Sequence, residues 1–286
     1  MILPVNDKFK KIYTTDKRII IITGGRGSGK SFNTSLFLKR LTYEKGHTIL
    51  YTRYTMTSAE KSVIPEFNEK IELEEDFKYF DVTSKSIINK ASGSQIVFSG
   101  IKTSSGNQTA NLKGIQGLTT FVVDEAEEWT KEDEYDKIRL SIRTKGVKNR
   151  VIIVMNPTDV NHFVFQKYFK DTYEFKDVDG VQVQMSTHPD VEHIHTTYLD
   201  NIEHLAPDFL QDVKSIKETN KKKYEEVVIG RWRDKKEGVI LPNWTKGEFN
   251  NDLPYIFVLD WGSKDPFTLT KMAIDRKHMK IYVKNL

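Results

Sequence analysis

The stretch GGRGSGKS, residues 24–31, decides the fold. The apolar run Ile19–Ile22 precedes it and is typical of a buried strand. The residues that follow, SFNTSLFLKRL (31–41), place Leu36, Phe37 and Leu41 on one face of a helix. The spacing G-x-x-x-x-G-K-S between a strand and a helix is that of a phosphate-binding loop. The sequence therefore predicts a P-loop nucleotide-binding fold.

The residue types in this loop suit a nucleoside triphosphate. Glycines let backbone N–H groups converge on phosphate oxygens, and the following helix adds its N-terminal donors. We expect Lys30 to neutralise the β- and γ-phosphates and the Ser31 hydroxyl to ligate Mg²⁺. Arg26 has two interpretations, an ordinary arginine in an exposed turn or a cation supplied in cis beside the γ-phosphate. The predicted ATP-binding residues are Gly24, Gly25, Arg26, Gly27, Ser28, Gly29, Lys30 and Ser31.

The composition is that of a globular protein with a core. The chain has 286 residues, of which 38% are hydrophobic, enough for one large domain or one domain with part of another. No apolar run approaches the ~20 residues of a membrane span, so we expect no membrane association. The absence of cysteine excludes disulfides and thiolate metal sites. A net charge of +4 permits contact with a polyanion without predicting one.

Strand and helix patterns alternate through the first half of the chain. Strands are predicted at 17–24, 47–54, 119–125 and 149–157, and a hairpin or two adjacent strands at 85–90 and 94–100. Such alternation favours an α/β fold with a mainly parallel sheet covered by helices. After about residue 160 the pattern weakens, and helices are predicted at 207–220 and 221–232.

Three regions follow from this pattern. We expect a P-loop ATPase domain at 1–235, with a helical subdomain at about 200–235. Residues 236–254 carry Gly, Pro and Asn and are predicted to be a linker. Residues 255–286 are predicted to form two strands, YIFVLDWG and MKIYVKNL, around a polar turn. Two strands cannot bury a core alone, so this tail is either an edge hairpin of the main domain or the beginning of another domain.

The segment FVVDEAEEW, residues 121–129, ends a predicted strand in carboxylates. We expect this strand to lie beside the phosphate loop, with Asp124 holding Mg²⁺ through water and Glu125 polarising the attacking water. A carboxylate next to the metal-binding aspartate favours hydrolysis over transfer to a substrate. Glu127 and Glu128 are interpreted as solvated. Predicted strands between Lys30 and Asp124 indicate the RecA-like (ASCE) order, and the lack of an NKxD motif favours ATP over GTP.

Taken in order, the motifs resemble those of the large terminase subunit of tailed bacteriophages, a motor that packs double-stranded DNA into a procapsid. The resemblance rests on GGRGSGKS, TRYTMTSAEKSVIPEF (52–67), SGSQIVFSGI (92–101), NLKGIQGLTTFVVDEAEEW (111–129), VMNPT (154–158), VVIGRWRDKKEGVIL (227–241) and FVLDWGSKDP (257–266). It spans nearly the whole chain. The phosphate loop alone is unspecific, whereas the ordered set is much more specific.

The resemblance implies roles for residues outside the two nucleotide motifs. Asn156, in VMNPT, would sense hydrolysis and relay it. Lys113 stands where many members carry an arginine that acts on the neighbouring subunit's ATP, and lysine lacks the bidentate fork of arginine. Arg139 and Arg143 are weaker alternatives for this trans-acting cation. With Lys113 at that position, Arg26 becomes the first cation to test.

The family also implies a nuclease domain of RNase H-like fold. Asp260 matches its first metal ligand, which would bind Mg²⁺ or Mn²⁺ together with later carboxylates. Because the chain stops at Leu286, we expect an incomplete nuclease site and an ATPase rather than an endonuclease. The implied partners are double-stranded DNA, the portal protein and the small terminase subunit. A homo-oligomeric ring, commonly a pentamer, would form at the procapsid portal vertex in the host cytoplasm and be absent from the mature virion, with a monomer in solution left open.

Other classes of protein share the phosphate loop. A helicase or other RecA-like DNA translocase would need a second RecA-like domain, for which the chain is too short. A P-loop kinase would not respond to DNA, and a capsid-associated protein with a vestigial loop would tolerate Lys30→Ala. Among smaller features, His193 and His195 are interpreted as polar surface rather than a metal site, and Arg53 as a possible phosphate contact.

Overall fold

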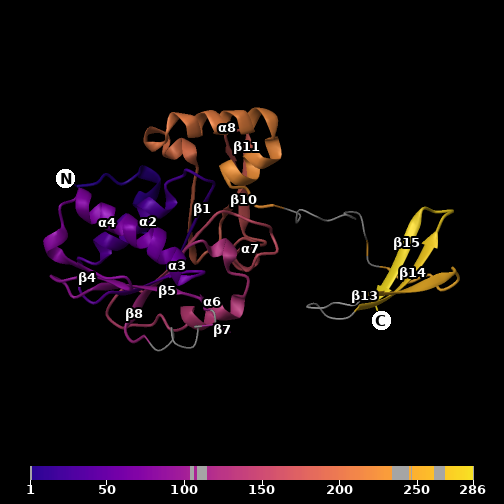
Figure 1. Cartoon of the computed structure of the whole chain (residues 1–286), viewed down its shortest axis with the longest axis horizontal. Coiled ribbons are helices and arrows are strands. Elements are labelled where there is room, and N and C mark those ends of the chain that lie inside the picture. Colours follow the sequence, from indigo (N-terminus) through magenta and orange to yellow (C-terminus); the bar gives the residue numbers. More distant parts are fainter. Residues whose placement is uncertain are drawn as a thin grey trace. The chain divides into compact units, whose positions relative to one another are not determined.

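The structure is a computed structural model that describes residues 2–103, 106–107, 115–233, 245, 247–260 and 268–285. The chain divides into two compact units, Met1–Lys236 and Glu237–Leu286 (Figure 1). None of the helices in the described ranges combines the length and the apolar content that crossing a membrane requires.

An eight-stranded sheet forms the centre of the first unit, in the order β12-β1-β9-β8-β2-β5-β4-β3. The strands from β12 to β5 run parallel, and β4 and β3 add an antiparallel edge. The predicted α/β fold is therefore confirmed. The strand bounds are β1 (Ile19–Gly24), β2 (Thr48–Arg53), β3 (Phe80–Val82), β4 (Ser86–Asn89), β5 (Gln95–Gly100), β8 (Leu118–Val123), β9 (Arg150–Met155) and β12 (Val191–Thr196).

Helices cover both faces of this sheet, because the central strands are apolar on both sides. Ile20 and Ile22 of β1 pack with α1 (Lys10–Thr14), α2 (Lys30–Leu41) and α4 (Ile64–Leu73). Ile19 and Ile21 face the opposite way, toward α6 (Glu132–Arg139) and α7 (Phe163–Tyr168). Burying each such isoleucine side chain stabilises the folded state by roughly 1.5–3 kcal/mol. The two layers hold the carboxyl ends of the parallel strands in fixed positions.

A smaller cluster of apolar residues lies beyond the sheet, between the hairpin β10–β11 and helix α8 (Figure 1). The hairpin consists of β10 (Tyr173–Val178) and β11 (Val181–Ser186), and α8 spans Pro207–Thr219. Helix α9 (Lys221–Lys223) and the π-helix η7 (Tyr224–Ile229) follow. The remaining elements are η1 (Asp7–Phe9), α3 (Met56–Ser58), the π-helix η2 (Ala59–Val63), η3 (Phe77–Tyr79), β6 (Lys102–Thr103), β7 (Gly106–Asn107), η4 (Ala126–Glu128), η5 (Tyr198–Asp200) and η6 (Ile202–His204).

The second unit is a three-stranded antiparallel sheet of β13 (Tyr255–Asp260), β14 (Thr268–Asp275) and β15 (Lys280–Asn285). The prediction of two strands was wrong, because β14 was included in the polar turn. Its sequence, TLTKMAID, mixes polar and apolar residues on both faces, so no regular alternation marks it as a strand.

Strand β1, which leads into the phosphate loop, lies between β9 and β12. Strand β9 therefore separates β1 from β8, although the end of β8 lies beside the phosphate loop, as expected. On its other side β1 pairs in parallel with β12, whose polar sequence VEHIHT gave a weak strand signal. Strand order is set by tertiary packing, which periodicity along the chain does not encode.

Candidate nucleotide-binding site

The phosphate loop links β1 to α2 and needs its glycines for two physical reasons. Gly27 and Gly29 have φ angles of 73° and 71°, in the left-handed region that favours glycine. At Gly24 and Gly25 a Cβ atom would lie 1.8 Å from a carbonyl oxygen, that of Thr196 and of Val228 respectively. The loop is therefore packed directly against the end of β12 and against η7.

Lys30, the first residue of α2, folds back over the loop. Its Nζ donates to the carbonyl oxygens of Gly24 (2.8 Å) and Gly25 (2.7 Å) and to Oγ of Ser28 (2.9 Å). A further bond reaches Oδ1 of Asn156, at 3.0 Å. Burial lowers the pKa of Lys30 to about 8, while Glu127 and Asp124 act in the opposite direction. An anion that entered the loop would compensate this buried cation.

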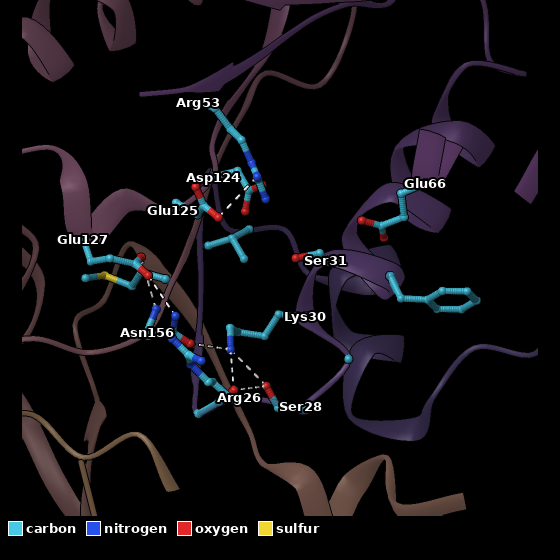
Figure 2. Close-up of a pocket in the computed structure, with 16 residues that line it drawn as sticks. Arg26, Ser28, Lys30, Ser31, Arg53, Glu66, Asp124, Glu125, Glu127 and Asn156 are labelled. Atoms are coloured by element: carbon cyan, nitrogen blue, oxygen red, sulfur yellow. Dashed lines mark hydrogen bonds and ion pairs between the residues drawn. The ribbon is translucent and has the colours of Figure 1, made fainter. Parts of the chain in front are cut away.

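Asp124 and Glu125 stand at the carboxyl end of β8 and share one cation, Arg53. Arg53 Nε donates to Asp124 Oδ2 at 2.8 Å, and its Nη1 lies 3.2 Å from Glu125 Oε1 (Figure 2). The hydroxyl of Tyr51 also donates to Asp124 Oδ2, at 2.8 Å. Asp124 is 2% exposed, and burial raises the pKa of Glu125. Arg53, interpreted from the sequence as a phosphate contact, thus holds the acidic pair in place.

Glu127 is not solvated, contrary to the sequence interpretation. It is partly buried, and its two carboxylate oxygens accept from Asn156: from Nδ2 at 2.8 Å and from the backbone N–H at 3.2 Å. The cause is local, because Glu125 has a φ angle of 52° and the turn η4 then directs Glu127 toward the end of β9 (Figure 2). Glu128 is exposed, as expected. Burial raises the pKa of Glu127.

These groups surround one cavity of about 420 Å³, a volume suited to a cofactor-sized ligand. Elements far apart in sequence supply its walls: the loop and α2, the ends of β2, β8 and β9, and Glu66 on α4 (Figure 2). Among the predicted site residues, the structure brings together Arg26, Lys30, Ser31, Asp124, Glu125 and Asn156. Gly24, the first residue of the loop, ends β1 and is not among the residues that line the cavity.

Comparison with sequence models of protein families shows the family to which the chain belongs. A sequence model described as phage terminase large subunit matches residues 16–231. The chain belongs to this family. It is also 21% identical over 234 residues to the PBSX phage terminase large subunit of Bacillus subtilis (strain 168), which covers 80% of this chain and 52% of that protein. The chain thus spans about half the length of this curated relative.

Solved terminases share the fold. The large terminase of a thermophilic bacteriophage superposes with a TM-score of 0.62 at 17% identity, covering 99% of this chain and 69% of that one. The large terminase ATPase domain of Thermus phage P74-26 gives a TM-score of 0.56 at 17% identity, covering 79% of this chain and 92% of that one. Other structures of the first of these proteins contain ADP or ATP-γ-S. At these identities the likeness concerns the fold alone.

The terminase resemblance also singled out residues that are not among those lining the cavity. Lys113 falls outside the described residues. Asp260 ends β13 in the second unit. Arg139 bonds Asp136 at 2.8 Å and does not line the cavity, and Arg143 is exposed.

The two histidines of β12 are buried, so their interpretation as polar surface was wrong. His193 Nε2 and His195 Nδ1 lie 2.7 Å and 2.9 Å from the hydroxyl of Thr23 on β1. Burial lowers the pKa of His195 to about 3. Within the described residues no cluster of three or more His, Asp or Glu side chains suited to a metal ion is found.

The oxygen ligands available at the cavity fit a cation that arrives with a nucleotide. Ser31 and Asp124 both line it and offer the hydroxyl and carboxylate oxygens that Mg²⁺ prefers. Both bonds to Asp124 from Arg53 and Tyr51 fall on Oδ2, so Oδ1 is the oxygen to which no bond is assigned among the described residues. Magnesium commonly takes one or two protein oxygens and completes its shell with phosphates and water.

Proposed function

We propose that this chain binds ATP with Mg²⁺ in the cavity at the end of β1, hydrolyses it, and thereby drives double-stranded DNA into a viral procapsid. The observation that carries the proposal is the convergence of Lys30, Asp124, Glu125 and Asn156 on one cavity of a RecA-like sheet. Membership of the phage terminase large subunit family supports it.

The binding step uses the loop and Lys30. The γ- and β-phosphates would take up the donors of Lys30, which now bond to loop oxygens and to Asn156. Ser31 and Asp124 would hold Mg²⁺, which supplies positive charge to the phosphates. Arg26, which is exposed at the rim, would place a further cation beside the γ-phosphate.

The chemical step uses Glu125 as the general base. Its carboxylate would take a proton from water as the water oxygen bonds to the γ-phosphorus and the bond to the β-phosphate oxygen breaks. Arg53 would hold the Glu125 carboxylate in position, since the two groups are 3.2 Å apart. The raised pKa of Glu125 makes it a stronger base than an ordinary surface glutamate. Asn156, between Lys30 and Glu127, would report the loss of the γ-phosphate.

The motor needs a second site for DNA. Lys221, Lys222 and Lys223 of α9 are exposed and would contact backbone phosphates, a contact that reads no sequence. The helix continues into η7, where Val227 and Val228 pack on the phosphate loop. A ring of subunits at the portal, the small terminase subunit and a trans-acting Lys113 are further parts of this proposal.

The second unit is proposed to begin an RNase H-like nuclease domain. Asp260 ends β13, which pairs with β14 in the three-stranded sheet, and would be the first ligand of a divalent nuclease metal. Nuclease chemistry would need further carboxylates beside it.

The test is ATP hydrolysis by the chain with and without double-stranded DNA. We expect hydrolysis that DNA stimulates and that Lys30→Ala abolishes, with Lys145→Ala, an exposed lysine remote from the cavity lining, as the matched control. A kinase of the same fold would not respond to DNA. Hydrolysis unchanged in Lys30→Ala would contradict the proposal.

A further inference from the structure

The side chain of Asn156 lies between two charged groups that oblige it to adopt one orientation. Its Oδ1 accepts from the Lys30 ammonium at 3.0 Å, and its Nδ2 donates to Glu127 Oε1 at 2.8 Å. Turning the amide over would place oxygen against the Glu127 carboxylate and an NH₂ group against the ammonium, two repulsive pairings. Glu127 and Lys30 therefore select the same orientation.

Glu127 holds the backbone of Asn156 as well as its side chain. Oε2 accepts from the Asn156 N–H at 3.2 Å, so both carboxylate oxygens are used on one residue. This fixes Asn156 at the point where the chain leaves β9. Hydrogen bonds to a charged acceptor are the stronger kind, and in a half-buried site they are expensive to lose.

Asn156 differs from the other acceptors that contact Lys30. Gly24, Gly25 and Ser28 belong to the phosphate loop, whereas Asn156 lies across the cavity, at the end of β9. An ammonium has three hydrogens, and these four acceptors share them. Among the printed hydrogen bonds of Lys30, the one with Asn156 links it to the end of β9, where Glu127 also bonds Asn156.

Two of the three glutamates that follow Asp124, Glu125 and Glu127, have separate partners. Glu125 faces Arg53, and Glu127 faces Asn156 (Figure 2). The left-handed turn at Glu125 produces this separation, because it reverses the chain before η4. The short segment after β8 thereby supplies the proposed general base, Glu125, and also contacts the proposed sensor, Asn156, through Glu127.

We propose that Glu127 is a positioning residue for the ATPase: it holds the Asn156 amide with its oxygen toward Lys30, so that Asn156 responds to the γ-phosphate. The inference rests on the proposed function and adds Glu127 to its machinery. Glu127 acts through Asn156 and does not itself take the proton from water, which is the task of Glu125.

The decisive experiment is a double-mutant cycle on the steady-state hydrolysis of ATP. Glu127→Ala should lower kcat about tenfold, the loss of one to two charge-assisted bonds. KM should change less than about threefold, because the loop donors are intact. In an Asn156→Ala background Glu127→Ala should cost little more, since its effect passes through Asn156. Glu128→Ala, in the same turn but exposed, is the matched control and should match wild type.

Two conservative variants and one spectroscopic measurement complete the test. Glu127→Asp keeps two acceptor oxygens and should recover part of the kcat, and Glu127→Gln keeps the shape if the alanine variant fails to fold. The Asn156 side-chain NH₂ signal, assigned by NMR from Asn156→Ala, should exchange slowly in wild type and Glu128→Ala and faster in Glu127→Ala and Glu127→Gln.

The outcomes separate this inference from the function on which it rests. Additive losses of kcat in the cycle, or an Asn156 signal indifferent to Glu127, overturn the positioning role even if ATP is hydrolysed. A wild-type chain without ATPase activity overturns the proposed function, while the NMR comparison still decides whether Glu127 holds Asn156.

Discussion

Arg53→Ala is expected to destabilise the first unit, because Arg53 is the cation that the acids at the end of β8 share. It lies 2.8 Å from Asp124, which is 2% exposed, and 3.2 Å from Glu125. Removing one partner of a buried ion pair costs about 3–5 kcal/mol. For Arg53→Ala we expect the free energy of unfolding to fall by about 3 kcal/mol, the lower end of this range. The reason is that Tyr51 still donates to Asp124 and the cavity admits water.

The assay is equilibrium urea unfolding of wild type, Arg53→Ala, Arg53→Lys and Arg143→Ala. Arg53→Lys keeps the charge without the fork that reaches both acids, so its stability should fall between wild type and Arg53→Ala. Arg143 is exposed, and its alanine variant should lie within about 0.5 kcal/mol of wild type. Saturating Mg²⁺ with nucleotide should recover part of the loss, if Asp124 meets the metal. A cost below about 0.5 kcal/mol for Arg53→Ala would refute the assigned pairing.

Two further predictions concern the strands that flank the phosphate loop. His195 is buried with its pKa lowered to about 3, so below the unfolded pKa of about 6.5 the unfolded chain binds a proton that the folded chain excludes. Because of this residue, the free energy of unfolding should fall by about 1.4 kcal/mol per pH unit as pH drops from 6.5 toward 3. Urea titrations at several pH values should show a smaller dependence on pH for His195→Asn. An unchanged dependence would contradict the burial of His195. Gly25→Ala places a Cβ 1.8 Å from the Val228 carbonyl oxygen, so fluorescent-nucleotide titrations should show at least about tenfold weaker binding. Gly247→Ala, with open space around its Cβ and no left-handed backbone, should bind as wild type. Equal affinities would show that the loop does not rest on η7.

The sequence was sufficient for the parts of the site that have fixed spacing. The loop from Gly24 to Ser31 has a spacing that only one local structure uses, and it predicted the strand and helix around it. Apolar runs before Asp124 and Asn156 predicted that each follows a buried strand. Carboxyl ends of parallel strands meet at one edge, so these residues could be expected to converge.

What the sequence could not give depends on turns and on strand order. Glu127 is the acid after Asp124 that faces Asn156, and the left-handed backbone of Glu125 determines this. A turn has no sequence periodicity, so its direction could not be predicted. A β-strand end likewise does not reveal whether Arg53 points toward phosphate or toward carboxylates. The burial of His193 and His195 follows from the pairing of β12 with β1, elements that lie far apart in the sequence.

The central claim is that the cavity at the end of β1 hydrolyses ATP with Glu125 as the base. Its most direct measurement is single-turnover hydrolysis of ATP by wild type and Glu125→Gln, with Glu128→Gln as the control and nucleotide affinity measured in parallel. We predict that Glu125→Gln binds ATP within a few-fold of wild type and hydrolyses it about 10²–10⁴ times more slowly, the usual contribution of a general base. Hydrolysis at the wild-type rate in Glu125→Gln would contradict the account.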